Sequence, residues 1–355
     1  MNRQIARDLK PHWGAAEIRR ELADLLEPRP GIYWADFITS VGIGWGMFVL
    51  TLRFPLSSLA YWACLGVCAL ALYRAVSFTH ELVHLRKSAV PGFRTGWTLL
   101  CGIPLLVPNF LYAEVHIAHH AKSKYGTSLD GEYLPFASST PWLVLGHLLS
   151  NLVLPAFAIA RFAIIGPASF LSRRLRRVVI EHLSAMALRF PFRREGPSRT
   201  EDRVLWLKEE LLTSAVLWLA LVGMATGVLS LKLLGQYALV IFLVATLNSI
   251  RAVGATHRYL SRGAEISFRD QIWDSVNLPS ARLDALMLCP VGLRYHALHH
   301  ALPTLPYHAL GEGHRRLTRV LPRDAEYHRL TIRSVWRGWY DLFANIRGHR
   351  VVTRT

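Results

Sequence analysis

Histidines stand in three compact groups along the chain, and their spacing is typical of metal ligands. Two groups have the pattern His-x-x-His-His, at His116–His120 and His296–His300, and a third is the pair His80 and His84. On a helix, positions i, i+3 and i+4 share one face. Each group can therefore direct its imidazoles toward one point, and neutral imidazole is a common ligand of zinc, iron, copper and nickel.

Together the three groups contain eight histidines. A structural zinc takes four ligands, and a catalytic zinc takes three and a water. Any one group alone is also compatible with histidines at a surface or a helix end, but three groups exceed the needs of a single ion. The sequence therefore predicts a site for more than one metal ion, assembled from distant parts of the chain.

The first group also matches a zinc-protease motif, because Glu81 follows His80 in the pattern His-Glu-x-x-His. In that motif the glutamate is a general base. A protease would leave the other two histidine groups without a role. In a site with several ions, Glu81 would instead accept the second N–H of an imidazole or act as a weak extra ligand.

The composition points to a membrane protein. Of the 355 residues, 52% are hydrophobic, yet 41 are Lys or Arg and the net charge is +17. Both features are compatible if apolar residues form membrane spans and basic residues lie outside them, on the cytoplasmic face or near anionic headgroups. The sequence has no nucleic-acid recognition motif, so we expect no nucleic-acid partner. The cysteines form no Cys-x-x-Cys pair, and we expect them to pack in apolar surroundings.

Four apolar stretches are close to the roughly 20 residues that a helix needs to cross a bilayer. They are residues 33–52, 56–78, 211–231 and 237–253. Short connections join the first stretch to the second and, at residues 232–236, the third to the fourth, which predicts two helical hairpins. This arrangement leaves the histidine groups and most charged residues on one side of the membrane.

Two further apolar segments, 95–112 and 141–167, contain glycine and proline. Each lies between groups of residues that must share one side of the membrane if the histidines are to form one site. We therefore expect re-entrant or interfacial segments here rather than full spans. The basic run Arg173–Arg177 follows the second segment, and the positive-inside rule assigns it to the cytoplasm.

The predicted fold is an all-α integral membrane protein. It has four transmembrane helices in two hairpins, re-entrant or interfacial helices, and a cytoplasmic helical cap that holds the histidine-rich di-metal site. Residues 1–32 are predicted to be an amphipathic cytoplasmic segment. Residues 33–320 would form the membrane domain and residues 321–355 a cytoplasmic tail.

The three histidine groups in this order, with four spans, resemble the integral-membrane fatty acid desaturase superfamily, which includes related hydroxylases and ketolases. The resemblance covers roughly residues 40–320. It implies two iron ions on the cytoplasmic side, O2 as co-substrate, and removal of hydrogen from an unactivated CH2 group of a lipid chain.

The resemblance also implies which residues bind the irons. Carried over by position, the ligands are His80, His84, His116, His119, His120, His296, His299 and His300, with His257 in the place of a ninth ligand found in some members. Related enzymes carry an asparagine four residues before that ninth histidine, where this chain has Val253. Asp130 could support a ligand or be a solvated loop acid. Of the isolated histidines, His308 is expected to lie nearest the ligands.

The expected reaction is O2-dependent desaturation of a fatty acyl chain, because acyl desaturases have the His-x-x-His-His form of the second group. The alternatives are a lipid or alkane hydroxylase or ketolase on the same scaffold, and a zinc intramembrane protease. A metal transporter is a non-enzymatic alternative, but it would require polar ligands inside the spans, which are nearly free of ionisable residues.

The reaction needs electrons from outside the chain, since the sequence has no haem motif and no Gly-x-Gly-x-x-Gly fingerprint. We expect a ferredoxin, rubredoxin or cytochrome b5 type of donor with its reductase. The run Arg173–Arg177 could dock an acidic donor or attract anionic lipid. The substrate would be an acyl lipid, acyl-CoA or acyl-carrier conjugate, and the location a bacterial cytoplasmic membrane.

Overall fold

The computed structural model describes the chain except for residues 1–13, 137–138, 187–191, 198 and 353–355. Its regular elements are helices, and the bridges between extended residues are isolated ones such as His257 with Ser275. The predicted all-α fold is confirmed. The helices are α1 Ala15–Glu21, α2 Pro30–Thr51, α3 Leu59–His84, α4 Phe93–Trp97, α5 Ala113–His120, α6 Pro141–Ser150, α7 Leu154–Ala160, α8 Gly166–Ser169, α9 Arg173–His182, α10 Thr200–Ala225, α11 Leu231–Ala255, α12 Phe268–Asp274, α13 Leu283–Leu288, α14 His296–Ala301, α15 Tyr307–Val320 and α16 Val335–Val352.

Three described helices, α2, α3 and α11, are long and apolar enough to cross a membrane. They correspond to the first, second and fourth predicted spans. The second prediction ended too early, because α3 continues without a break through His84. The first histidine pair therefore lies in the last turns of a membrane helix and is held in place by it.

The third predicted span, residues 211–231, is wrong in its bounds. Helix α10 begins at Thr200 and ends at Ala225, and it carries Lys208 and two buried glutamates in its middle turns. The turn predicted at residues 232–236 is helical and belongs to α11. The chain turns earlier because Gly227 adopts a left-handed conformation (φ +76°), which a β-carbon would strain.

The predicted broken segment at residues 141–167 consists of α6 followed by a helical stretch that runs from Leu154 to Ser169. The two parts are bent by 52° and together form either one broken span or a re-entrant loop. Asn151 lies at the bend, and its side-chain amide donates to the Ser249 hydroxyl of α11 at 3.0 Å. The other broken segment contains α4, a π-helical stretch at Thr98–Gly102 and a short 3-10 turn at Asn109–Leu111.

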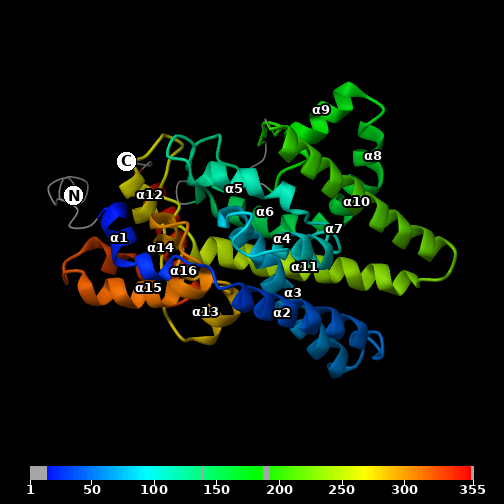
Figure 1. Cartoon of the computed structure of the whole chain (residues 1–355), viewed down its shortest axis with the longest axis horizontal. Coiled ribbons are helices and arrows are strands. Elements are labelled where there is room, and N and C mark those ends of the chain that lie inside the picture. The colour runs from blue at the N-terminus through cyan, green and yellow to red at the C-terminus, as the bar shows by residue number, and fades with distance from the viewer. Residues whose placement is uncertain (1–13, 137–138, 187–191, 198, 353–355) are drawn as a thin grey trace.

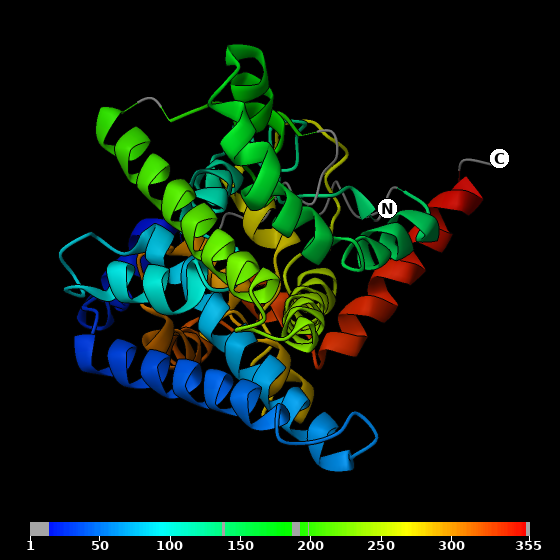
Figure 2. The same cartoon turned by 90° about the vertical axis from the view of Figure 1, so that its right-hand side faces the viewer.

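The two ends of the chain pack on the helices around the histidines. Ile18 and Leu22, at the end of α1, are buried in an apolar cluster with residues of α14 and α15. Helix α16, predicted to lie in a tail, crosses the end of α11, where the Trp339 indole N–H donates to the Ile250 carbonyl at 3.1 Å (Figure 2). Both segments thus form part of the cap seen on the left of Figure 1.

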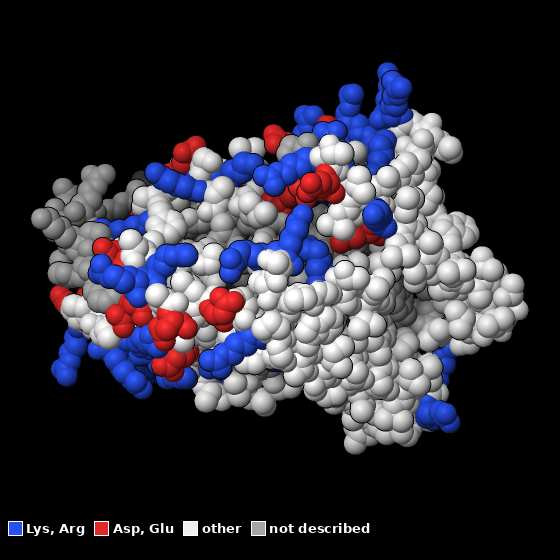
Figure 3. Space-filling model, in the orientation of Figure 1, with Lys and Arg blue, Asp and Glu red and all other residues white. Residues whose placement is uncertain are grey.

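Charge divides the molecule into two parts. In Figure 3 the Lys, Arg, Asp and Glu side chains gather over the cap and near α9, whereas the part where α10 and α11 extend furthest is mostly white. Exposed apolar side chains on this part include Leu219, Val222 and Leu231. Such a surface is typical of helices that contact lipid.

Candidate metal centre

The first histidine cluster joins α3, α5 and α14. Ring nitrogens of His80, His84, His116 and His299 all lie within 4.8 Å of one another. His120 adjoins them, because its Nε2 atom is 3.1 Å from Nε2 of His116 and 3.1 Å from Nε2 of His299. Three of the five rings are buried and those of His84 and His120 are half-buried, and both nitrogens of His80 lack a hydrogen-bond partner among the described residues.

The second cluster joins α5, the segment after α11, and α14. It consists of His119, His257, His296 and His300, all of them buried, with ring nitrogens again within 4.8 Å of one another. The Nε2 atom of His257 is 3.1 Å from that of His119 and 3.0 Å from that of His296. The histidine after α11 is therefore brought together with three members of the predicted set.

Each His-x-x-His-His group is divided between the two clusters. In α5, His116 and His120 face the first cluster and His119 faces the second; in α14, His299 faces the first and His296 and His300 face the second. The expectation that each group points to one place is therefore wrong. At about 100° per residue, positions i+3 and i+4 of a helix diverge by about 100°, so a pair of ions placed side by side separates them.

The hydrogen bonds around the second cluster show why it suits a cation. His119 Nδ1 lies 2.9 Å from a carboxylate oxygen of Asp130 and donates its proton there. His257 Nδ1 lies 2.8 Å from the Tyr125 hydroxyl, which itself donates to Asp274, so His257 must donate as well. The Nε2 atoms of both histidines then present lone pairs to each other at 3.1 Å. Two facing lone pairs repel unless a positive charge lies beside both of them, either a metal ion or a second proton on His119, whose pKa the Asp130 carboxylate raises.

Burial sets the protonation of most of these rings. Burial, with the charge of neighbouring rings, lowers the pKa of six histidines well below the ordinary value: His116, His120, His257, His296, His299 and His300. They are therefore neutral at pH 7, the form that binds metal. For His119, burial also disfavours the charged form, but the Asp130 carboxylate outweighs it and the pKa is raised.

Carboxylates from the segment after α5 and from the end of α12 support the histidine rings. Asp130 is fully buried and accepts the His119 proton, so it is not the solvated acid that was the alternative. Glu132 lies 2.9 Å from His116 Nδ1, and burial raises its pKa to about 7. Asp274 accepts hydrogen bonds from Tyr125 and from Tyr133. Sequence inspection did not select Glu132 or Asp274; the closeness of Glu132 to His120 in sequence was the one available signal.

Glu81 has a different role from the predicted one. Its carboxylate accepts a hydrogen bond from the Tyr33 hydroxyl at 2.6 Å and one from the backbone N–H of Tyr307 at 3.1 Å. The nearer imidazole nitrogen, Nδ1 of His80, is 3.9 Å away. One residue of helix turns Glu81 by about 100° from His80, so it ties α2 and α15 to α3 instead of orienting an imidazole.

Two other residues singled out from sequence lie away from the metal-binding atoms. His308 Nε2 accepts the backbone N–H of Arg29 at 3.1 Å, so it joins α15 to the chain before α2. Val253 is buried in an apolar cluster with Tyr125, Tyr133 and Tyr259 and offers no ligand atom. His147, on α6, lines the cavity described next.

A cavity of about 270 Å³ opens between α3, α6 and α11 and reaches both clusters. His80 and His116 of the first cluster and His119, His257 and His296 of the second are among its lining residues. Apolar side chains of α3 and α11, such as Val76, Ile241 and Val244, form another part of its lining, and polar residues of the same helices line it as well. The cavity could therefore hold an aliphatic chain beside two metal ions.

Comparisons with known proteins agree with this arrangement. The family model described as "Fatty acid desaturase" matches residues 56–331. The chain is 40% identical over 325 residues, 91% of each chain, to a protein named "Ceramide hydroxylase" from Caulobacter vibrioides (strain NA1000 / CB15N). The search of solved structures found no match.

Proposed function

Because the chain belongs to the fatty acid desaturase family, we propose that this oxidoreductase is a membrane-bound di-iron enzyme that hydroxylates a ceramide. The observation that carries the proposal is the 40% identity to a ceramide hydroxylase across 91% of both chains. Desaturation of a fatty acyl chain, favoured by the sequence pattern alone, becomes the second candidate. The reaction converts R–H, O2, two electrons and two protons into R–OH and water.

The two clusters would each hold one iron, with His80, His84, His116, His120 and His299 around the first and His119, His257, His296 and His300 around the second. Bound iron would supply the oxidising chemistry with O2 that breaks an unactivated C–H bond. The protein's part is to hold the rings. Asp130 and the pair of Tyr125 and Asp274 keep Nδ1 protonated, so that each Nε2 is free to bind metal.

Lipid analysis tests the reaction. The chain would be expressed in bacterial cells that make ceramide, and lipids from cells with and without the protein compared by mass spectrometry. Hydroxylation adds the mass of one oxygen atom to the ceramide, whereas desaturation removes the mass of two hydrogens. A ceramide pool without an oxygenated species would refute the proposal, and a loss of two hydrogens would establish the second candidate. Metal analysis of the purified protein separates both from a zinc protease, which would contain zinc and no iron.

Asp130→Asn is expected to weaken metal binding at the second cluster by about 10- to 100-fold. The amide oxygen of asparagine is a neutral and weaker acceptor than the carboxylate, so it holds the His119 ring and its Nδ1 proton less firmly. Iron retained after dialysis against graded chelator measures the change. Asp324→Asn, at an exposed position of the cap, is the matched control. Equal iron retention in both variants would contradict the role of Asp130.

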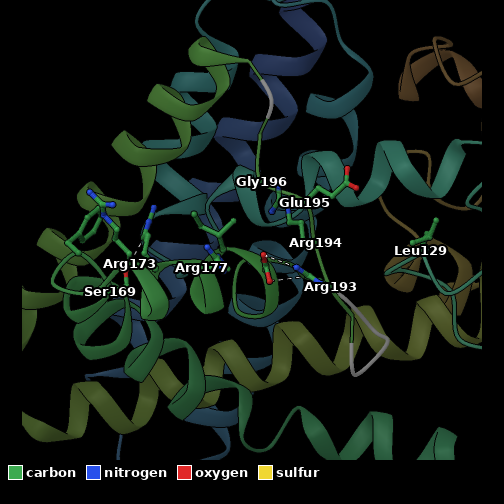
Figure 4. Close-up of a pocket in the computed structure, with 12 residues that line it drawn as sticks. Leu129, Ser169, Arg173, Arg177, Arg193, Arg194, Glu195 and Gly196 are labelled. Carbon is green, nitrogen blue, oxygen red and sulfur yellow. Dashed lines mark hydrogen bonds and ion pairs between the residues drawn. The ribbon is translucent and has the colours of Figure 1, made fainter.

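An electron donor is proposed to dock beside α9. A trough of about 820 Å³ is lined there by Arg173, Arg176, Arg177 and Arg193, with Arg194 and two glutamates (Figure 4). Arg193 pairs with Glu181 and Arg176 with Glu210, whereas Arg173 and Arg177 are exposed. An acidic ferredoxin would find complementary charge on this surface.

Reversing the two exposed charges with Arg173→Glu and Arg177→Glu is expected to slow electron transfer from an acidic ferredoxin by about 10-fold or more at low salt. The measurement is the rate of donor oxidation by the purified enzyme in vesicles of neutral lipid. Arg323→Glu with Arg333→Glu makes the same change of charge elsewhere on the exposed surface. If both double variants accept electrons at the wild-type rate, the donor docks elsewhere.

A further inference from the structure

The lining of the cavity beside the histidines changes from apolar to polar along α11. Ile241 and Val244 line its apolar part, followed by Asn248 and Arg251, and His257 of the second cluster comes just beyond the end of the helix. At a rise of 1.5 Å per residue, Val244 and Arg251 are separated by about 10 Å along the helix axis. The polar end of the cavity is therefore the end next to the metal site.

Arg251 is the strongest donor in this polar end. Its Nη2 atom donates to the Asn248 side-chain oxygen at 2.9 Å, while its buried Nε has no hydrogen-bond partner. Within the described part of the chain it forms no ion pair. Arg251 is half-buried, but a buried N–H without an acceptor is costly, so its Nε is available to a partner that is bound in function.

A second unused polar atom faces the same space. Nε2 of His147, on α6, is buried and also lacks a partner. The hydroxyls of Ser77 and Thr256 also line the cavity, but each already donates a hydrogen bond to the backbone carbonyl four residues earlier. Among the described cavity-lining residues outside the histidine clusters, the buried polar atoms without a partner are Arg251 Nε, His147 Nε2 and Glu132 Oε1, which together can bind a ligand oxygen and a ligand hydroxyl.

We propose that Arg251, with Asn248 and His147, binds the amide and hydroxyl groups of the lipid, so that oxidation takes place a few bonds from that polar group. The proposal rests on the proposed ceramide hydroxylation. Arg251 can only donate, so it requires an acceptor such as an amide carbonyl, which a plain hydrocarbon segment lacks.

This placement fits the shape of the site. An amide held at Arg251 leaves one hydrocarbon chain for the apolar end, toward Val244 and Leu105, which belong to one apolar cluster. The carbons next to the amide then lie at the end of the cavity lined by histidines of both clusters. Arg251 would thus be a positioning residue that selects both the lipid class and the attacked carbon.

The test measures lipid binding to the purified, iron-loaded enzyme in detergent, with a short-chain ceramide and a saturated hydrocarbon of equal length as probes. Arg251→Met is expected to weaken ceramide binding by about 10- to 100-fold, the usual effect of losing a charge-assisted hydrogen bond, and to leave hydrocarbon binding unchanged. Val244→Trp, which fills the apolar end, should weaken both probes. The hydroxyl in the remaining product should spread over several carbons in Arg251→Met.

Arg251→Lys and Asn248→Leu keep the proposal testable if Arg251→Met does not fold, as judged by iron content and melting temperature. Lysine should restore part of the ceramide affinity, and Asn248→Leu should reduce it. Unchanged ceramide affinity in a folded Arg251 variant, or tighter binding of a fatty acid than of ceramide by the wild type, would overturn the proposal without touching the proposed hydroxylation. Ceramide binding that depends on Arg251, but without any oxygenated product, would support the binding role of Arg251 and contradict the proposed hydroxylation.

Discussion

His119→Ala enzyme is expected to retain no more than about one iron per chain and to form oxygenated ceramide at least about 100-fold more slowly than the wild type. The residue occupies the second cluster with His257, His296 and His300. Alanine removes one of four nitrogens and also leaves the Asp130 carboxylate buried without its N–H partner.

Iron per chain and product yield, measured on the same preparation, separate this effect from misfolding. His182→Ala, at an exposed position of α9, is the control and should keep both values. If the His119→Ala enzyme kept its full iron content, the second cluster would not bind metal through this ring. Full iron loss, from both clusters, would show instead that the two ions bind cooperatively.

Gly338→Ala is expected to destabilise the protein by about 1–3 kcal/mol or more and to lower its iron content. A β-carbon at position 338 would meet the backbone carbonyl of Gly254, and backbone cannot rotate aside as a side chain can. Helix α16 would have to move off the end of α11. Since Gly254 lies three residues before His257, that movement reaches the second cluster.

Thermal unfolding in detergent, followed with iron content, measures this prediction. Gly235→Ala is the matched control, because position 235 is also in a helix but has no atom within 4 Å of an added β-carbon. That change should be neutral or stabilise the helix by about 0.5–1 kcal/mol. Similar melting temperatures for the two variants would contradict the prediction, because they would show that α16 can shift away from α11 at little cost in stability.

Much of the arrangement could be predicted from local patterns. Long apolar stretches identified α2, α3 and α11, because a membrane helix must satisfy its own backbone within one segment. The i, i+3, i+4 spacing marked the histidines of α5 and α14, since helical periodicity depends on neighbours in sequence alone. The bend after α6 was likewise visible as glycine and proline within an apolar segment.

Contacts between distant segments could not be predicted in this way. Arg251 and His147 were ordinary residues of apolar segments until the packing of α6 and α11 placed both at one cavity. Asp274 reaches His257 only through Tyr125, a chain of hydrogen bonds between three separate parts of the sequence. The turn between α10 and α11 was predicted at residues 232–236, whereas the chain turns at Gly227, whose left-handed conformation is a property of the folded backbone.

Short patterns were enough to predict that histidines of three groups form a metal site, because ligand chemistry and helical periodicity are properties of short segments. How the histidines are shared between two clusters depends on the packing of the helices. This packing assigned His119 and His120, adjacent in sequence, to different clusters, and it turned Glu81 away from the rings toward Tyr33 and Tyr307. The physical reason is that a side chain's direction follows from its own helix, whereas its partner follows from the helices packed against it.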